Sequence, residues 1–140
     1  MKFWDSSAIV PLLVQEETSE QMRRLVLEDK DMLVWWGTPV ECTSAISRRE
    51  RDGDLDPQTT SIALERLRTL APTWSEIQPS DRLRTLAQRS LRVHALRAAD
   101  SLQLAAALVG AGNDPASLDM VCLDHRLVLA AQREGFRVIL

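Results

Sequence analysis

Four acidic residues stand where a carboxylate could do chemistry in this 140-residue sequence. Asp5 directly follows the apolar residues of KFW, and Asp124 directly follows MVCL. Glu41 comes shortly after MLVWW, and Asp100 begins the apolar segment DSLQLAAALVG. An acid in such a place often caps a helix, because its side-chain oxygen accepts a hydrogen bond from an unpaired amide of the first turn. Each acid alone could therefore serve only to cap a helix, but four acids in the same kind of place need a further explanation.

The elements around these acids are predicted by the pattern of apolar residues. Alternating strands and helices predict an α/β fold with a mostly parallel central sheet flanked by helices. The carboxyl ends of parallel strands share one edge of a sheet, so the four acids should converge at that edge. Helical periodicity is clear over residues 61–70 and 83–91. Short apolar runs predict buried strands at residues 2–4, 31–36, 120–123 and 136–140.

Capping patterns predict where several helices begin. Residues 18–21 (TSEQ) and 38–41 (TPVE) both fit a capping box, and Asp56 before a proline predicts another helix start. In the second box Glu41 would reach back to the amide of Thr38. This capping role is an alternative to a role of Glu41 as a ligand.

The composition fits one globular domain over residues 1–140, because 45% of the residues are hydrophobic and no linker or repeat interrupts the chain. No segment approaches the roughly 18 apolar residues of a membrane span. Asp5 also interrupts the first apolar run before it could serve as a signal peptide. We therefore expect a cytoplasmic protein with no membrane partner, in which Cys42 and Cys122 are reduced thiols.

The net charge of −3 provides no overall attraction for nucleic acid. A local basic face remains open, because 15 of the 17 basic residues are arginines. A guanidinium group pairs with phosphate oxygens through a planar fork that lysine lacks. A general preference for arginine over lysine would explain the same count.

Acids gathered at one edge of a sheet repel one another. Two like charges about 4 Å apart cost ~4 kcal/mol at an effective dielectric of 20, and helix capping does not require that cost. A divalent cation removes the repulsion. Oxygen ligands without thiols or a histidine pair favour Mg²⁺ or Mn²⁺ over zinc. Such ions bridge a phosphodiester, activate water and stabilise the leaving oxygen, so the pattern favours phosphodiester hydrolysis.

Four stretches of sequence, spread in order over nearly the whole chain, resemble the PIN domain and specifically the VapC-type toxins of toxin–antitoxin pairs. These stretches are FWDSSAIV, TPVECTSAISR, LRAADSLQLAAAL and VCLDHRLVLAAQREGF. The resemblance implies a single Rossmann-like domain and a metal-dependent ribonuclease with Mg²⁺ or Mn²⁺ as its cofactor. The family's small hydroxyl residue corresponds to Ser7. Its catalytic and metal-binding acids correspond to Asp5, Glu41, Asp100 and Asp124.

The same resemblance implies partners and a cellular effect. Members of the family cleave RNA, often tRNA or ribosomal RNA, and thereby inhibit translation. A VapB-like antitoxin neutralises the toxin, and the toxin is expected to form a homodimer.

The sequence departs from the family's pattern near the last acid. Many members carry Thr or Ser two residues before that acid, where this chain has Cys122. The segment before Asp124 is also long, with a predicted loop at residues 110–119 that brings Asp114 and Asp119 as rival acids. Asp124 is preferred because it directly follows the apolar run.

Arginines near these motifs are candidates for holding the phosphates of RNA, on the ground of their proximity in the sequence. They are Arg48, Arg97 and Arg126. Residues 41 and 48 lie on similar faces of a helix, so Arg48 should point closer to the site than Arg49 does. Surface ion pairs with neighbouring acids are the alternative role for these side chains.

Other functions remain open from the sequence. A PIN-fold binding module could keep all four acids without catalysis. A phosphatase could use Asp5 as a nucleophile, although Ser7 stands where a haloacid-dehalogenase-like site would have a second aspartate. Residues 52–57 (DGDLDP) resemble the start of a calcium loop, but a proline replaces the turn glycine, so they predict a turn and a cap. A lone exposed histidine such as His125 is more often a bystander than a base.

Overall fold

Five parallel strands form the central sheet of the computed structural model, which describes all 140 residues. The order across the sheet is β3-β2-β1-β4-β5, so Phe3 of the central strand pairs with Leu33 on one side and Met120 on the other. The parallel pairing confirms the predicted α/β class. The strands are β1 (Lys2–Trp4), β2 (Met32–Trp35), β3 (Ser75–Ile77), β4 (Met120–Val121) and β5 (Val138–Ile139).

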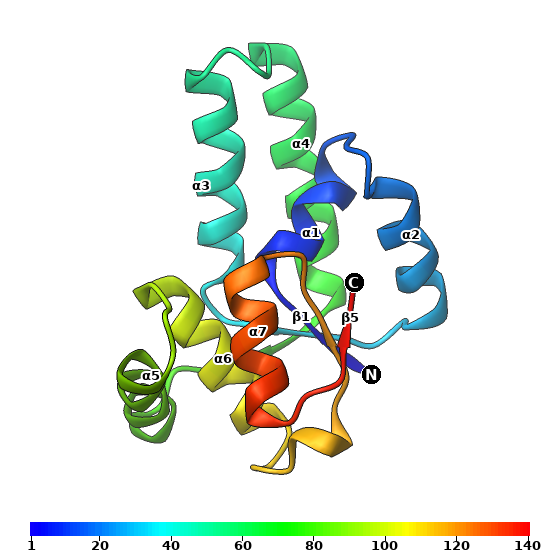
Figure 1. The fold of residues 1–140 in the computed structure, drawn as a ribbon. Helices are drawn as coiled ribbons and strands as arrows, with labels where there is room; N and C mark the ends of the chain where they lie inside the picture. The colour runs from blue at the N-terminus through cyan, green and yellow to red at the C-terminus, as the bar shows by residue number, and fades with distance from the viewer.

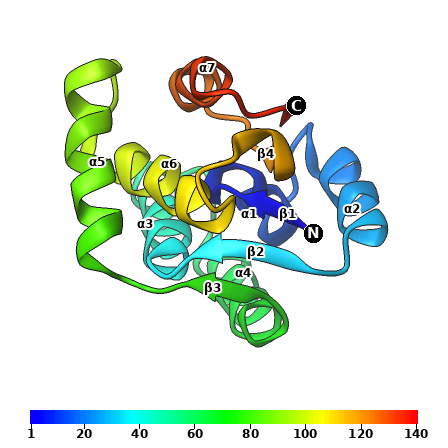
Figure 2. The same ribbon diagram turned by 90° about the horizontal axis from the view of Figure 1, so that it is seen from below.

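Seven helices cover the two faces of this sheet (Figures 1 and 2). One face is covered by α1 (Ser6–Leu13), α2 (Ser19–Glu28), α3 (Thr38–Arg51) and α4 (Pro57–Leu70). The other face is covered by α5 (Asp81–Val93), α6 (Ala98–Gly110) and α7 (His125–Glu134). Two short 3₁₀ helices, η1 (Ala71–Thr73) and η2 (Pro115–Ser117), lie in the connections. In Figure 1 α3 and α4 form a hairpin that projects beyond the rest of the molecule.

The core is divided by the alternation of side chains along the strands. Phe3 and Trp35 pack with α5, α6 and α7, whereas Trp4 and Val34 pack with the helices of the opposite face. Both faces of the sheet are therefore apolar, which is typical of parallel sheets covered on both sides. This packing holds the strands from both sides and fixes the residues at their carboxyl ends.

The strands differ from the sequence prediction at their ends and at one edge. The strands predicted at residues 31–36, 120–123 and 136–140 are each shorter in the structure, because their outer residues lie in the flanking loops. The edge strand β3 was not predicted. Its three residues are at least partly exposed and include a single apolar side chain, so it carries no signal of a buried strand.

The helix starts agree with the sequence only in part. The side chain of Asp56 accepts a hydrogen bond from the amide of Thr59 at 2.7 Å, which confirms that cap. The side chains of Thr18 and Thr38 make no capping bond, so both predicted capping boxes are wrong. Gly37 is the N-cap of α3. The Thr38 hydroxyl is fully buried and contacts a side chain of α6 instead of its own helix.

The connecting segments follow the turn signals of the sequence. Residues 52–56 form the turn between α3 and α4, with Gly53 at a φ of 83°, a conformation that favours glycine. The loop predicted at residues 110–119 is present, and it reverses the chain through Gly112 and Asn113, whose φ angles are 60° and 61°. No helix of the structure combines the length and the apolar character needed to cross a membrane.

Candidate active site

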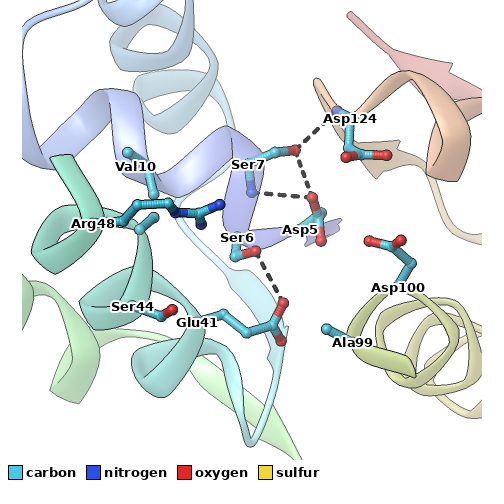
Figure 3. Close-up of a pocket in the computed structure, with 11 residues that line it drawn as sticks. Asp5, Ser6, Ser7, Val10, Glu41, Ser44, Arg48, Ala99, Asp100 and Asp124 are labelled. Carbon is cyan, nitrogen blue, oxygen red and sulfur yellow. Dashed lines mark hydrogen bonds between the residues drawn. The ribbon is translucent and has the colours of Figure 1, made fainter. Parts of the chain in front are cut away.

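The structure brings together the four acids that the sequence singled out. Asp5, Glu41, Asp100 and Asp124 line one pocket of about 290 Å³ (Figure 3). They come from the β1–α1 junction, the first turn of α3, the first turn of α6 and the β4–α7 junction. The pocket therefore lies at the carboxyl edge of the sheet, where open α/β folds bind their ligands.

Ser7 fixes the position of Asp5 against that of Asp124. Oδ2 of Asp5 accepts hydrogen bonds from the Ser7 amide, at 3.0 Å, and from the Ser7 hydroxyl. The same hydroxyl accepts hydrogen bonds from the amides of Leu123, at 2.9 Å, and Asp124, at 3.1 Å. One side chain thus joins the β1–α1 junction to the β4–α7 junction (Figure 3).

Cys122 contacts both Asp5 and Ser7 from outside the lining of the pocket. Its thiol is fully buried and donates to Oδ2 of Asp5 at 3.7 Å, and it lies 3.8 Å from the Ser7 hydroxyl. Burial, followed by the negative charge of Asp5, raises the pKa of the thiol, so it remains protonated and can donate. Cys122 therefore packs against the carboxylate, and the hydroxyl beside Asp5 is that of Ser7.

Glu41 is held by partners from two other helices. The Ser6 hydroxyl of α1 donates to Oε1 at 3.2 Å, and Nε2 of Gln103 on α6 donates to Oε2 at 3.0 Å. The carboxylate therefore lines the pocket and does not reach back to the amide of Thr38, so the alternative role as a cap is not formed. Burial raises the pKa of Glu41 to about 7, and the charge of Asp5 acts in the same direction.

Asp100 and Asp124 each use one oxygen to cap a helix. Oδ2 of Asp100 accepts from the amide of Arg97 at 3.2 Å, and Oδ1 of Asp124 accepts from the amide of Leu127 at 2.9 Å. The second oxygen of each carboxylate accepts no hydrogen bond, and the same holds for Oδ1 of Asp5. The structural and the chemical explanations of these acids are thus compatible, because each helix start needs only one of the two oxygens.

The pocket is negative and poorly solvated at its base. Burial raises the pKa of Asp5, and the charges of Asp124 and Asp100 raise it further, against the lowering effect of the hydrogen bonds from Ser7. Burial also raises the pKa of Asp100, and Asp124 adds to this shift. These carboxylates repel one another, so a positive charge in the pocket would be favourable.

The donor set fits a hard divalent cation by its chemistry. The pocket offers carboxylate oxygens, three of them free of hydrogen bonds, and the two thiols of the chain are buried outside its lining. As the side chains stand, no three His, Cys, Asp or Glu residues are grouped closely enough to hold a metal ion.

Arg48 is the basic residue in the lining of the pocket. It lies two helical turns after Glu41 on α3, and its guanidinium group points toward the residues of α1 (Figure 3). Its neighbour Arg49 forms an ion pair with Glu16 instead. Helical spacing therefore predicted correctly that Arg48, and not Arg49, lies closer to the pocket.

The other two candidate arginines lie beside the pocket and not in its lining. Arg97 is the N-cap residue of α6, and Arg126 lies in the first turn of α7. Both side chains are exposed, and their positive charges lower the pKa of Asp100. Their guanidinium groups are therefore near the carboxylates without forming an ion pair with them.

Three other residues considered from the sequence do not line the pocket. Asp119 pairs with Arg137 at 3.6 Å, and Asp114 is the N-cap of η2. His125 is exposed at the start of α7. The preference for Asp124 over the two rival acids agrees with this arrangement.

Sequence reasoning missed Gln103, which contacts Glu41. The signal was a lone amide inside the apolar segment DSLQLAAALVG, one helical turn after Asp100. Ser6 and Ser44, which also line the pocket, were missed as well. Small hydroxyl residues are common on helices, and nothing in their spacing distinguishes them.

No protein-family model matches the chain, and no curated protein matches it in sequence. Three solved structures are similar over nearly its whole length. A toxin–antitoxin complex from Klebsiella pneumoniae is 13% identical, with a TM-score of 0.68, covering 100% of this chain and 97% of that one. FitAcB from Neisseria gonorrhoeae is 17% identical, with the same TM-score and coverage. FitAB bound to an IR36 DNA fragment is 15% identical, with a TM-score of 0.67, covering 99% and 94% of the two chains.

These similarities extend over the sheet, both helical layers and the four junctions that carry the acids. Sequence identities of 13–17% leave the fold as the property that the proteins share. The chain therefore has the fold of these three structures, which is the PIN-type fold that its sequence motifs predicted.

Proposed function

We propose that this protein is the toxin of a toxin–antitoxin pair and acts as a Mg²⁺- or Mn²⁺-dependent endoribonuclease. The observation that carries the proposal is the meeting of Asp5, Glu41, Asp100 and Asp124 in one pocket at the carboxyl edge of a PIN-type sheet. Its substrate is RNA, in particular tRNA or ribosomal RNA, and its cleavage inhibits translation.

The four carboxylates are the residues that would hold the cation. When bound, Mg²⁺ or Mn²⁺ neutralises charge on the phosphodiester and lowers the pKa of an attacking water. Ser7 contributes by fixing Asp5 relative to the β4–α7 junction. Ser6 and Gln103 contribute by holding the carboxylate of Glu41 in the pocket.

Arginines supply the positive charge that an acidic protein needs around its substrate. Arg48 in the pocket lining is placed to pair with a phosphate next to the scissile one. Arg97 and Arg126, exposed beside Asp100, would hold phosphates further along the strand. Phosphate contacts of this kind position an RNA without reading its sequence.

The partner proposed for this toxin is a VapB-like antitoxin, and the toxin itself is proposed to be a homodimer. Both proposals rest on the similarity of sequence motifs to VapC-type toxins, and the antitoxin is supported by the similar fold of a toxin–antitoxin complex from Klebsiella pneumoniae. A basic side chain of the antitoxin placed near the carboxylates would compete with the metal ion. Expression of the toxin alone should stop growth, and co-expression of the cognate antitoxin should restore it.

RNA cleavage by the purified protein tests the proposal directly. Labelled tRNA and ribosomal RNA should be cut with Mn²⁺ or Mg²⁺ and remain intact with EDTA. The Asp100→Asn variant should be inactive, whereas the control Asp119→Asn, an acid outside the pocket, should cut normally.

Three results would contradict the proposal in distinguishable ways. RNA binding without cleavage under any metal would indicate a catalytically silent PIN-fold module. Hydrolysis of a phosphomonoester such as para-nitrophenyl phosphate in place of RNA would indicate a phosphatase that uses Asp5. Cleavage that continues in Asp100→Asn would place the nuclease activity elsewhere or in a contaminant.

A further inference from the structure

We propose that Gln103 is a positioning residue that orients the carboxylate of Glu41 toward the metal-binding pocket. The inference rests on the proposed function, and it assigns a role to a residue outside the family's acidic set. Gln103 lies on α6 and is fully buried. It is three residues after Asp100, so the same face of α6 carries Asp100 and the side chain that holds Glu41.

The amide of Gln103 joins two helices that are far apart in the sequence. Its Nε2 donates to Oε2 of Glu41 at 3.0 Å and to the hydroxyl of Thr38 at 3.1 Å. Both acceptors are in the first turn of α3, so the two hydrogens of one amide group tie the start of α3 to α6. The reverse orientation of the amide would set its oxygen against the Glu41 carboxylate, which repels it.

Glu41 needs outside support more than the other three acids do. Asp5, Asp100 and Asp124 each accept a hydrogen bond from an amide of their own helix start. Glu41 has no such bond, and its side chain is longer by one rotatable bond. The two groups that hold it are the Ser6 hydroxyl and the Gln103 amide. Loss of the amide would leave one oxygen of Glu41 without a donor.

Stability alone does not explain a glutamine at this position. The other buried residues of α6 are apolar apart from Ser101, which bonds within its own helix. Oε1 of Gln103 is buried and has no hydrogen-bond donor, which is unfavourable in a protein interior. A methionine of similar length would fill the same space without that unpaired oxygen. A residue that breaks a packing rule in this way marks a functional constraint.

Calorimetric titration of the metal-free protein with Mn²⁺ tests the proposal without relying on activity. In Gln103→Met the affinity for Mn²⁺ should fall about 10- to 100-fold, the range found when outer-shell partners of metal ligands are removed. The melting temperature without metal should change little, because the variant removes the unpaired Oε1 as well as a donor to Glu41. In RNA cleavage, kcat should fall by a similar factor while KM for RNA stays near that of the unmodified protein.

Two further variants separate hydrogen bonding from packing. Gln103→His, which restores a donor of similar reach, should recover part of the Mn²⁺ affinity. Ser90→Ala removes a buried hydroxyl that bonds only within α5, and it should bind Mn²⁺ normally. If Gln103→Met does not fold, the double variant Gln103→Met with Thr38→Val also removes the buried hydroxyl that Gln103 contacts. Its affinity for Mn²⁺ then gives the same comparison.

The outcomes also separate this inference from the proposed function. Normal Mn²⁺ affinity and kcat in Gln103→Met, with an active unmodified protein, would overturn the role of Gln103 alone. Equal impairment in Gln103→His and Gln103→Met would assign the loss to packing and overturn the role too. An unmodified protein that neither binds Mn²⁺ nor cuts RNA would overturn the proposed function, on which the role depends.

Discussion

Two aspartates, one beside each end of β1, are almost equally buried and lie in opposite electrostatic surroundings. Asp29 is 2% exposed and Asp5 is 3% exposed. Asp29 accepts hydrogen bonds from a backbone amide of β1, at 2.9 Å, and from the Trp4 indole, at 3.0 Å. It also pairs with the amino group of Met1 at 2.9 Å. Asp5 receives hydrogen bonds from Ser7 and faces further carboxylates across the pocket.

The difference separates a buried charge that the fold itself compensates from one that it does not. A buried charge is costly unless partners compensate for it. The chain itself supplies a positive group and two donors to Asp29, so that residue is complete without any ligand. Asp5 lacks a positive partner, and its neighbours add repulsion. A cation from outside the chain would supply the missing compensation, which is the physical basis for proposing one at this edge.

The largest expected effect is the opposite response of these two aspartates to the same substitution. Asp5→Asn should reduce RNA cleavage by at least about a hundredfold and leave the fold intact, because asparagine is nearly isosteric and can still cap α1. Asp29→Asn should keep the activity at low temperature but lose about 2–3 kcal/mol of stability, because it removes an ion pair and turns an acceptor into a donor. Cleavage assays and urea unfolding of both variants measure these effects.

Either aspartate could break the comparison. An active Asp5→Asn would remove the basis for the metal site. An Asp29→Asn variant as stable as the unmodified protein would show that the ion pair with Met1 does not contribute measurably. Loss of activity in a folded Asp29→Asn would show that the two ends of β1 are not independent.

Stabilisation by a metal ion should depend on Asp5 and not on Asp29. Mn²⁺ at about 100 times its Kd should stabilise the protein by ~2.7 kcal/mol, because it binds the folded state alone. Thermal unfolding with and without Mn²⁺ measures this shift. Asp29→Asn should show the full shift from its lower starting point, and Asp5→Asn should show little or none. The absence of a shift in the unmodified protein at saturating Mn²⁺ would contradict the proposed site.

The pH dependence of stability should report the burial of Glu41 and the repulsion from Asp5. The pKa of Glu41 is raised from its ordinary value of 4.5 to about 7 in the folded protein, so between these values the folded state holds a proton that the unfolded state has lost. Stability of the metal-free protein should therefore fall as pH rises from about 4.5 to 7, by on the order of 2 kcal/mol, and then level off. The raised pKa of Asp5 acts with the same sign.

Glu41→Gln gives the matched control for this pH dependence. An amide does not titrate, so the variant should be flatter than the unmodified protein over the same range and more stable at pH 7.5 without metal. Urea unfolding at several pH values measures both. An identical profile in the two proteins would show that Glu41 titrates normally.

The convergence of the four acids was predictable because it follows from local rules. Each acid sits at a recognisable helix start, and parallel strands end at the same edge. Helical spacing was likewise enough to place Arg48 toward the pocket and Arg49 away from it. These inferences needed only the periodicity of the chain and the direction of the strands.

The parts that failed depend on contacts between distant residues. Residues 38–41 have the letters of a capping box, yet Gln103 draws Thr38 and Glu41 toward α6 across more than sixty positions of sequence. No local pattern shows that competition. The edge strand β3 was missed because its pairing with β2 is what forms it, and its own three residues carry one apolar side chain.

The smallest expected effect concerns the arginines that are proposed to hold RNA at the carboxylate edge. Arg48 and Arg97 are exposed and form no ion pair within the chain, unlike Arg49, which is paired with Glu16. Arg48→Ala or Arg97→Ala should each weaken RNA binding and lower the slope of log affinity against log salt by about one unit, while Mn²⁺ affinity stays nearly normal. Arg49→Ala should leave both the affinity for RNA and its slope almost unchanged. Binding measured from about 50 to 200 mM salt, with EDTA to prevent cleavage, gives these slopes. If the double variant of Arg48 and Arg97 keeps the original affinity and slope, the RNA does not run past these side chains. The phosphates of the RNA must then be held by another face of the protein.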